Sequence, residues 1–308
     1  MLDRRTLEQI QADTGFNLDI LEKVYHMSRI LSGLTQIKGF LDNFALKGGT
    51  SLNFLFLNVP RLSIDLDFDF IGDIEKNKMQ LKRKVFETKI DSLGDKLEYD
   101  GSSRNSSYII GRRQFRFRKL SGITDFVKIE LNYIDRMPID GTYSKRFPDI
   151  IPEHSGFFVN TYSLEELCAQ KIAACLDRGT ARDVFDIYEY SKMDMDLKKL
   201  KRLSALYFLL SSRTQDPDLT KVQGFESRRL QSELRLFLRD STVLETEDIK
   251  NTALRFLRDI LEFEGPIREF IEQFYKHNRI ESKLILPDGP DVNDHPGIKF
   301  VLDKRKSE

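Results

Sequence analysis

Residues 46–70 read LKGGTSLNFLFLNVPRLSIDLDFDF, and this stretch is the most informative part of the chain. The glycine pair Gly48-Gly49 is a common entry to a helix N-terminus, so we expect a short helix to begin near residue 50. At the end of the stretch Asp65, Asp67 and Asp69 alternate with apolar residues. Because strand side chains point alternately to the two faces, the carboxylates line one face and the apolar groups the other.

The aspartate strand predicts metal-dependent phosphoryl chemistry. Asp65 and Asp67 lie roughly 6.5–7 Å apart along a strand, close enough to share one hydrated Mg²⁺ or a pair of them. A solvated strand face is the alternative, but neighbouring aspartates repel one another unless a cation neutralises them. Asp69 is expected to be only a surface residue. An EF-hand is excluded, because its sixth and twelfth positions hold Phe70 and Lys76, and the glycine segment lacks the P-loop pattern.

Composition sets broad bounds on the protein. A chain of 308 residues suggests two domains, and 49 basic against 49 acidic residues steer it toward no charged partner. No apolar run approaches the ~18 residues of a membrane span, and the N-terminus has no apolar signal segment. Cys168 and Cys175 cannot staple a protein of this size. We therefore expect a cytoplasmic protein without membrane contact.

Periodicity predicts an α+β chain with a mixed N-terminal core, residues 1–160, and a helical domain, residues 161–308. In the core we expect helices over 17–34 and 76–96, strands over 108–118, 126–133 and 156–161, and a loop over 136–156. In the second domain we expect helices over 163–177, 182–191, 197–210, 224–239 and 247–275. The tail from residue 287 is expected to be extended or frayed.

Glu130 lies on the polar face of the predicted strand 126–133. It can serve as a third metal carboxylate or be an ordinary exposed glutamate, and the sequence leaves both interpretations open.

Lys171 interrupts the apolar stripe of the helix that begins after Ser163. A lysine in such a stripe must extend its ammonium to the surface or reach into a cleft. Together with Arg178 and Arg182 it can gather a triphosphate, while Asp183 or Asp186 orients one of the cations or acts as a base. The alternative is a set of helix caps and salt bridges.

The segment from Arg112 to Lys119 is basic and carries Phe115 and Phe117 between its charges. Gln114, Arg116 and Arg118 share one face of a strand, where they can contact a nucleic-acid backbone. A charged, exposed edge strand is the alternative explanation.

Four motifs in order resemble the AbiEii/AbiGii toxin family of nucleotidyltransferases, which includes the MenT toxins of type IV toxin–antitoxin systems. The family patterns K-G-G-T-x-L and R-x-S-x-D-h-D, h being apolar, match Lys47–Leu52 and Arg61–Asp67. The patterns K-h-x-A and R-D-x-x-D-h-Y match Lys171–Ala174 and Arg182–Tyr188. The early family motif E-K-D-Y has valine in third place here, at Glu22–Tyr25, and we assign it no role.

The resemblance implies a DNA-polymerase-β-like nucleotidyltransferase core whose active-site cleft is completed by the helical domain. It implies Mg²⁺, transfer of NMP from an NTP to RNA, notably the tRNA 3′ end, and a cognate antitoxin. By position, the implied metal ligands are Asp65 and Asp67, with Glu130 matching only as an acidic residue on a following strand. The implied catalytic residues are Asp65, Asp67, Lys171 and Asp183. The implied nucleotide-binding residues are Lys47, Gly48, Gly49, Thr50, Ser63, Arg182 and Asp186.

Two other functions stay open at this point. The same chemistry can modify a small hydroxylated molecule such as an antibiotic, in which case activity would not depend on RNA. A protein that binds NTP or RNA without turnover is the third possibility, although the intact aspartate pair argues against it.

Overall fold

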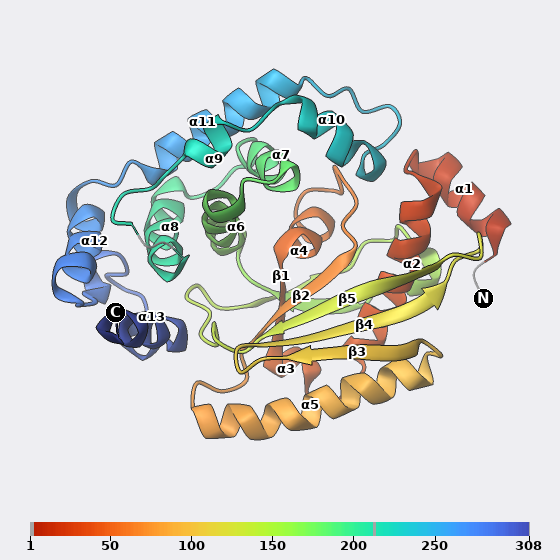
Figure 1. The fold of residues 1–308 in the computed structure, drawn as a ribbon, viewed down its shortest axis with the longest axis horizontal. Helices are drawn as coiled ribbons and strands as arrows, with labels where there is room; N and C mark the ends of the chain where they lie inside the picture. The colour runs from red at the N-terminus through yellow and green to blue at the C-terminus, as the bar shows by residue number, and fades with distance from the viewer. Residues whose placement is uncertain (1–2, 212–213, 308) are drawn as a thin grey trace. The chain divides into compact units, whose positions relative to one another are not determined.

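The computed structural model describes residues 3–211 and 214–307, apart from the side chains of 101–104 and 307, and divides the chain into two compact units (Figure 1). The first unit comprises Met1–Pro138, Thr142–Tyr162 and Leu236–Thr242. The second comprises Ile139–Gly141, Ser163–Arg235 and Val243–Glu308. Each unit is therefore discontinuous in sequence, because the chain passes between the two units more than once.

The first unit is built on a seven-stranded sheet with the strand order β3-β4-β5-β2-β1-β7-β6. The strands are β1 (Phe44–Lys47), β2 (Asp65–Phe70), β3 (Asp100–Ser106), β4 (Ile110–Arg118), β5 (Thr124–Asn132), β6 (Tyr143–Arg146) and β7 (Phe158–Thr161). The pairs β2–β5 and β1–β7 are parallel and the other neighbours are antiparallel, so the sheet is mixed. The α+β class predicted from the sequence is confirmed.

In the central strands, buried hydrophobic residues alternate with polar ones, so one side of the sheet is apolar. Leu66, Phe68 and Phe70 of β2 are buried, and Phe115 and Phe117 of β4 are buried on the same side of the sheet. Helices pack against this apolar side because it has to be removed from water.

The helices of the first unit are α1 (Arg4–Thr14), α2 (Leu18–Thr35), α3 (Phe40–Asn43), α4 (Gly48–Leu55), α5 (Lys76–Lys96) and the 3₁₀ turn η1 (Pro152–His154). The predictions of helices over 17–34 and 76–96 are confirmed, and the predicted short helix begins at Gly48. Helix α1 and strands β1 and β3 were not predicted, and β6 and η1 lie within the predicted loop 136–156.

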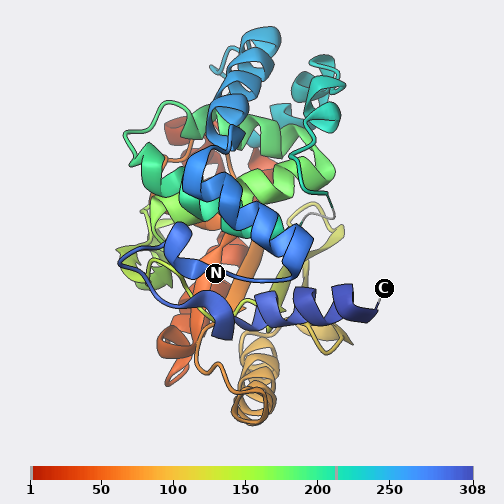
Figure 2. The ribbon, with the colours of Figure 1, turned by 90° about the vertical axis from the view of Figure 1, so that its left-hand side faces the viewer.

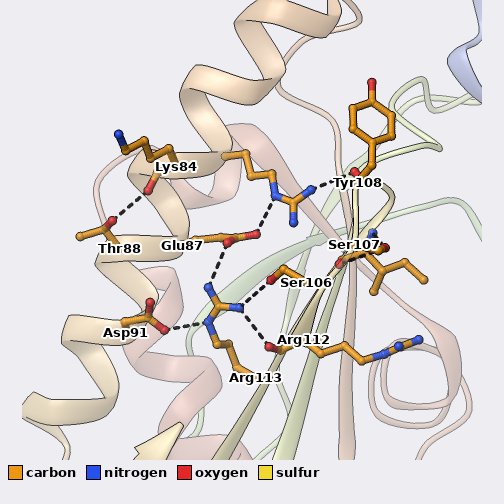
Figure 3. Close-up of polar contacts among 11 residues, drawn as sticks. Lys84, Glu87, Thr88, Asp91, Ser106, Ser107, Tyr108, Arg112 and Arg113 are labelled. Carbon is orange, nitrogen blue, oxygen red and sulfur yellow. Dashed lines mark hydrogen bonds and ion pairs between the residues drawn. The ribbon is translucent and has the colours of Figure 1, made fainter. Parts of the chain in front are cut away.

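A buried ion network joins α5 to the sheet (Figure 3). Arg113 of β4 is 3% exposed, and its guanidinium pairs with Asp91 at 2.7 Å and with Glu87 at 3.0 Å, both from α5. Arg83 also pairs with Glu87, at 2.8 Å, and donates to the carbonyl oxygen of Tyr108. Helix α5, which runs alongside β3 in Figure 1, therefore covers the side of the sheet toward which Arg113 points.

Strand β4 lies between β3 and β5, so the interpretation of residues 112–119 as an edge strand is wrong. The sequence of β3 is small and polar and carries little strand signal, which is why the true edge was missed.

The second unit is helical: α6 (Leu164–Arg178), α7 (Ala181–Tyr190), α8 (Leu197–Ser211), α9 (Thr220–Gln223), α10 (Arg228–Leu234), α11 (Thr246–Leu261), α12 (Gly265–His277) and α13 (Pro296–Ser307). Helices α6, α7, α8 and α11 pack around a shared core, and Figure 2 shows α11 to α13 in blue. Within the described residues, no helix combines the length and the hydropathy required of a membrane span.

Three predictions for this unit are corrected. Of the expected helix over 224–239 only α10, Arg228–Leu234, is an α-helix. Leu236–Thr242 joins the first unit, where the Phe237 carbonyl accepts from the Leu62 amide. The expected helix over 247–275 is two helices, because Gly265 adopts a left-handed φ of 52° just before a proline. The tail beyond residue 287 contains α13, and only Glu308 of it lies outside the described residues.

Candidate active site

Strand β2 carries the first two predicted metal ligands. Asp65 and Asp67 are both partly exposed on the face opposite the buried Leu66 and Phe68. Burial, together with the carboxylates of Asp65 and Glu130, raises the pKa of Asp67. This face of the strand thus concentrates negative charge that a bound cation would neutralise.

Glu130 lies directly beside Asp67, because the parallel pairing of β2 and β5 puts these two residues in register. Its carboxylate accepts hydrogen bonds from Arg112 at 2.8 Å and pairs with Lys128 at 3.0 Å. Burial would raise the pKa of Glu130, but these two cations outweigh it and lower the pKa. Glu130 is therefore an ionised carboxylate next to Asp67, and in this structure two protein cations already hold it.

Asp69 is not the surface residue that the alternation predicted. Its side chain is fully buried, with Lys47 Nζ 2.6 Å from Oδ1 and the Tyr162 hydroxyl donating to Oδ2 at 2.8 Å. The Asn132 amide donates to Oδ1 at 2.8 Å. Burial raises the pKa of Asp69 to about 6, against the opposing effect of the Lys47 ammonium. The sequence missed this cluster because its members come from β1, β2, β5 and the end of β7, which only the folded sheet brings together.

Lys47, the residue just before the glycine pair, is thus already engaged inside the first unit. Burial alone would lower its pKa, but the carboxylates of Asp69 and Asp135 together raise it. The ion pair with Asp69 ties the end of β1 to β2, immediately before α4 begins. A contact of Lys47 with nucleotide stays a prediction.

The glycine pair is required by close packing at the start of α4. Gly48 has a φ of +69°, and a Cβ built on it would lie 2.9 Å from Asp67 Oδ2. A Cβ on Gly49 would lie 2.7 Å from the guanidinium of the buried Arg61 and 3.2 Å from Ser63 Oγ. The backbone at the N-terminus of α4 therefore lies directly against the carboxylate of Asp67, one of the two predicted metal ligands.

Thr50 connects this turn to the aspartate strand. Its hydroxyl lies 3.0 Å from Ser63 Oγ and donates to the backbone carbonyl of Asp65 at 2.5 Å. Both Thr50 and Ser63 are buried. In this structure they position the strand, and a direct role in nucleotide binding stays a prediction.

Lys171 lies in a separate, buried charge cluster of the second unit. Its side chain is 7% exposed, and its ammonium is 3.2 Å from Asp183 Oδ1 and 2.9 Å from Asp186 Oδ2. Both aspartates are buried. The Lys171 ammonium thus neutralises charge on two carboxylates inside the helical core, and a contact of Lys171 with nucleotide stays a prediction.

Asp183 is the centre of this cluster. The Arg178 guanidinium donates to both of its oxygens, at 2.7 and 2.8 Å, and the hydroxyl of Thr180, the residue that caps α7, donates at 2.7 Å. Burial would raise the pKa of Asp183, but Lys171 and Arg178 hold it well below its usual range. The structure thus contains the helix cap and the salt bridges of one interpretation, and binding of a triphosphate by Lys171, Arg178 and Arg182 stays a prediction. Arg182 is exposed at the start of α7.

Comparison with known proteins decides the family. The model of the "Nucleotidyl transferase AbiEii toxin, Type IV TA system" family matches residues 29–275. The chain belongs to the AbiEii family. This AbiEii protein is accordingly a nucleotidyltransferase of a toxin family, as the motifs predicted. A search of curated proteins found no match.

The fold of this AbiEii chain is similar to that of a solved toxin structure. MenT4, a nucleotidyltransferase toxin from Mycobacterium tuberculosis H37Rv, is 18% identical in sequence, and the match covers 99% of each chain with a TM-score of 0.66. At that identity the likeness establishes a shared fold.

The donor set of the AbiEii chain fits a hard divalent cation such as Mg²⁺. Asp65 and Asp67 supply carboxylate oxygens on one face, and burial, followed by the neighbouring Asp65 carboxylate, raises the pKa of Asp67. In the part of the chain that the structure describes, no group of three or more histidine, cysteine or acidic side chains is preorganised around a single metal position. Mg²⁺ is commonly bound by one or two carboxylates together with water and substrate phosphates, and the Asp65–Asp67 pair fits that kind of site.

Proposed function

We propose that this protein transfers NMP from an NTP to an RNA acceptor in the cytoplasm, with Mg²⁺ held by Asp65 and Asp67. The observation that carries the proposal is the contact between Gly48 and Asp67. Helix α4 begins so close to the carboxylate that a single Cβ would lie 2.9 Å from its oxygen. Backbone amides that bind phosphate and carboxylates that bind metal are thereby adjacent in one small region of the first unit.

The chain's own residues supply positioning and charge. The amides of Gly48 and Gly49 are the first of α4 and have no acceptor within that helix, so they are suited to bind the triphosphate of the NTP. Thr50 holds the backbone of Asp65, so that the two carboxylates stay on one face. When bound, Mg²⁺ would neutralise the charge that develops on the phosphoryl oxygens and on the departing pyrophosphate.

The second unit supplies the other proposed residues. We propose Lys171 and Asp183 as active-site residues, and Arg182 and Asp186 as residues that support nucleotide binding, on the two family motifs that contain them. The family match extends over both units, which supports a role for each. Because Lys171, Asp183 and Asp186 are buried together, the role we propose for the cluster is to orient groups of α6 and α7.

A cognate antitoxin is proposed as the partner that controls the activity. The matched family is described as a toxin of a type IV toxin–antitoxin system, which supports such a partner. A tRNA 3′ end is the acceptor that we propose within the RNA class, on the motif resemblance alone.

One labelling experiment tests the proposed function. The protein is incubated with each α-labelled NTP, Mg²⁺ and total cellular RNA, and the products are separated by size. Label should enter RNA, and both Asp65→Asn and Asp67→Asn should abolish it, whereas the exposed α5 control Asp95→Asn should not. Label in a small hydroxylated compound, independent of added RNA, would show instead that the acceptor is a small molecule.

A further inference from the structure

The sheet face that carries Asp65 and Asp67 continues across β5 and β4. The register places Glu130 beside Asp67 and Arg112 beside Glu130. Further along β5 toward its N-terminus, the cross-strand pairs are Lys128–Gln114, Phe126–Arg116 and Thr124–Arg118. Paired residues of a sheet point to the same side, so one polar face leads from the catalytic aspartates to the two distal arginines.

Standard sheet spacing gives the distances along this face. Two strand separations of about 4.8 Å and a rise of about 3.4 Å per residue put Arg116 about 12 Å from Asp65, and Arg118 about 17 Å. Both arginines are therefore close enough to Asp65 to bind a linear polymer whose end lies at the aspartates.

Only Arg116 and Arg118 are available for a ligand among the basic residues of β4. Arg112 is engaged by Glu130, and Arg113 is buried against α5. Arg116 and Arg118 are exposed, and among the side chains that the structure describes no carboxylate lies within ion-pair distance of either guanidinium. Among the described residues, the Arg118 guanidinium donates to the Gly122 carbonyl, at 3.3 Å.

Phe126 places an exposed aromatic ring among these cations. It is 37% exposed, it lies in register with Arg116, and the Lys23 ammonium is 5.0 Å from its ring centroid. An aromatic ring on a strand with flanking cations is the arrangement that binds single-stranded nucleic acid, because bases stack on the ring while the cations bind phosphates.

We propose that Arg116, Arg118 and Phe126, which we name the acceptor patch, bind the acceptor as an unpaired RNA strand. This inference rests on the proposed function and adds where the acceptor lies and in what form. The two guanidiniums contact phosphates and the ring stacks on a base. Because a base in a duplex has no free face, the patch favours single-stranded over fully paired RNA.

The test measures equilibrium binding of a labelled single-stranded RNA oligonucleotide at several salt concentrations, by fluorescence anisotropy. Arg116→Gln/Arg118→Gln should weaken binding about tenfold and make the slope of log K against log salt shallower by about 1.4, that is about 0.7 for each lost phosphate contact. Phe126→Leu should weaken binding about 5- to 150-fold with an unchanged salt slope, because stacking releases no counterions. A duplex of the same length should be insensitive to Phe126→Leu.

The matched control removes the same charge from the other side of the sheet. Lys84 and Lys96 are exposed on α5, so Lys84→Gln/Lys96→Gln should leave both affinity and slope unchanged. NTP binding, measured by titration, should be the same in all variants.

Two results would overturn the inference and they are distinguishable. If the arginine variant binds and labels RNA as well as the wild type does, the acceptor patch is wrong and the proposed function stands. If the wild-type protein neither binds nor labels RNA while it still releases pyrophosphate from NTP, the RNA acceptor itself is wrong.

Discussion

Replacing Lys171 by methionine is expected to destabilise the second unit strongly. Methionine keeps the buried aliphatic stem and removes only the ammonium. That ammonium lies 2.9 Å from Asp186 and 3.2 Å from Asp183, and the side chains of these aspartates are 0% and 1% exposed. Removing the ammonium breaks the buried ion pair with Asp186 and takes one of the two cations from Asp183, which keeps Arg178, so we expect a loss of about 3–5 kcal/mol in the free energy of unfolding.

Chemical denaturation, followed by circular dichroism and by tyrosine fluorescence because the chain has no tryptophan, measures this loss. The control is Lys192→Met, which removes a half-exposed i,i+3 pair with Glu189 and should cost less than about 1 kcal/mol. In a double-mutant cycle, Asp186→Asn combined with Lys171→Met should cost less than the sum of the single changes, because the neutral amide no longer needs the lysine. A loss for Lys171→Met as small as that of the control would refute the buried-cluster reasoning. If Lys171→Met stayed as stable as the control but lost nucleotidyl transfer, Lys171 would act in catalysis and contribute little to the stability of the second unit.

Three further outcomes are expected. Asp67→Asn should abolish transfer yet leave the thermal midpoint equal or higher. Burial and the neighbouring carboxylates raise the pKa of Asp67, so its charge is unfavourable in the folded state, and a folded variant with full activity would exclude the proposed metal site. Gly48→Ala should cost at least about 1–2 kcal/mol of stability and lower transfer, since φ is +69° and the Cβ would meet Asp67; wild-type stability and rate would show that the turn is not required. Burial raises the pKa of Glu166 to about 7 although three hydrogen bonds from Ile139, Asp140 and Tyr207 oppose the rise. The folded state therefore binds the proton of the Glu166 carboxyl more tightly than the unfolded state does. The free energy of unfolding should fall by about 3 kcal/mol as pH rises from about 4.5 to about 7, and in parallel melts Glu166→Gln should lack that part of the pH dependence.

The aspartate strand and the long helices were predictable because their signals are local. Alternation over residues 65–70 and the helical periodicity of 18–35 or 76–96 depend only on neighbours in sequence. The motifs that resemble those of the AbiEii family are likewise short, and the family match over residues 29–275 confirms that resemblance.

Local signals failed where partners distant in the chain decide the outcome. The short β1, the polar β3 and the small β6 form because neighbouring strands pair with them, and their own sequences carry little pattern. The C-terminal tail looked extended from its composition, yet its last segment forms α13.

The family, and with it the class of reaction, could be predicted from the sequence, because the alternating carboxylates and the glycine turn are residue types at fixed local spacing. Which charged side chains are already paired or buried became visible only in the folded chain. Asp69 looked like a third exposed carboxylate and is buried against Lys47. For Lys171 the sequence left a cleft and a set of salt bridges both open, and the folded chain shows that two aspartates pair with it. The physical reason is that the state of a charge depends on its burial and on partners tens of residues away, and sequence spacing contains neither.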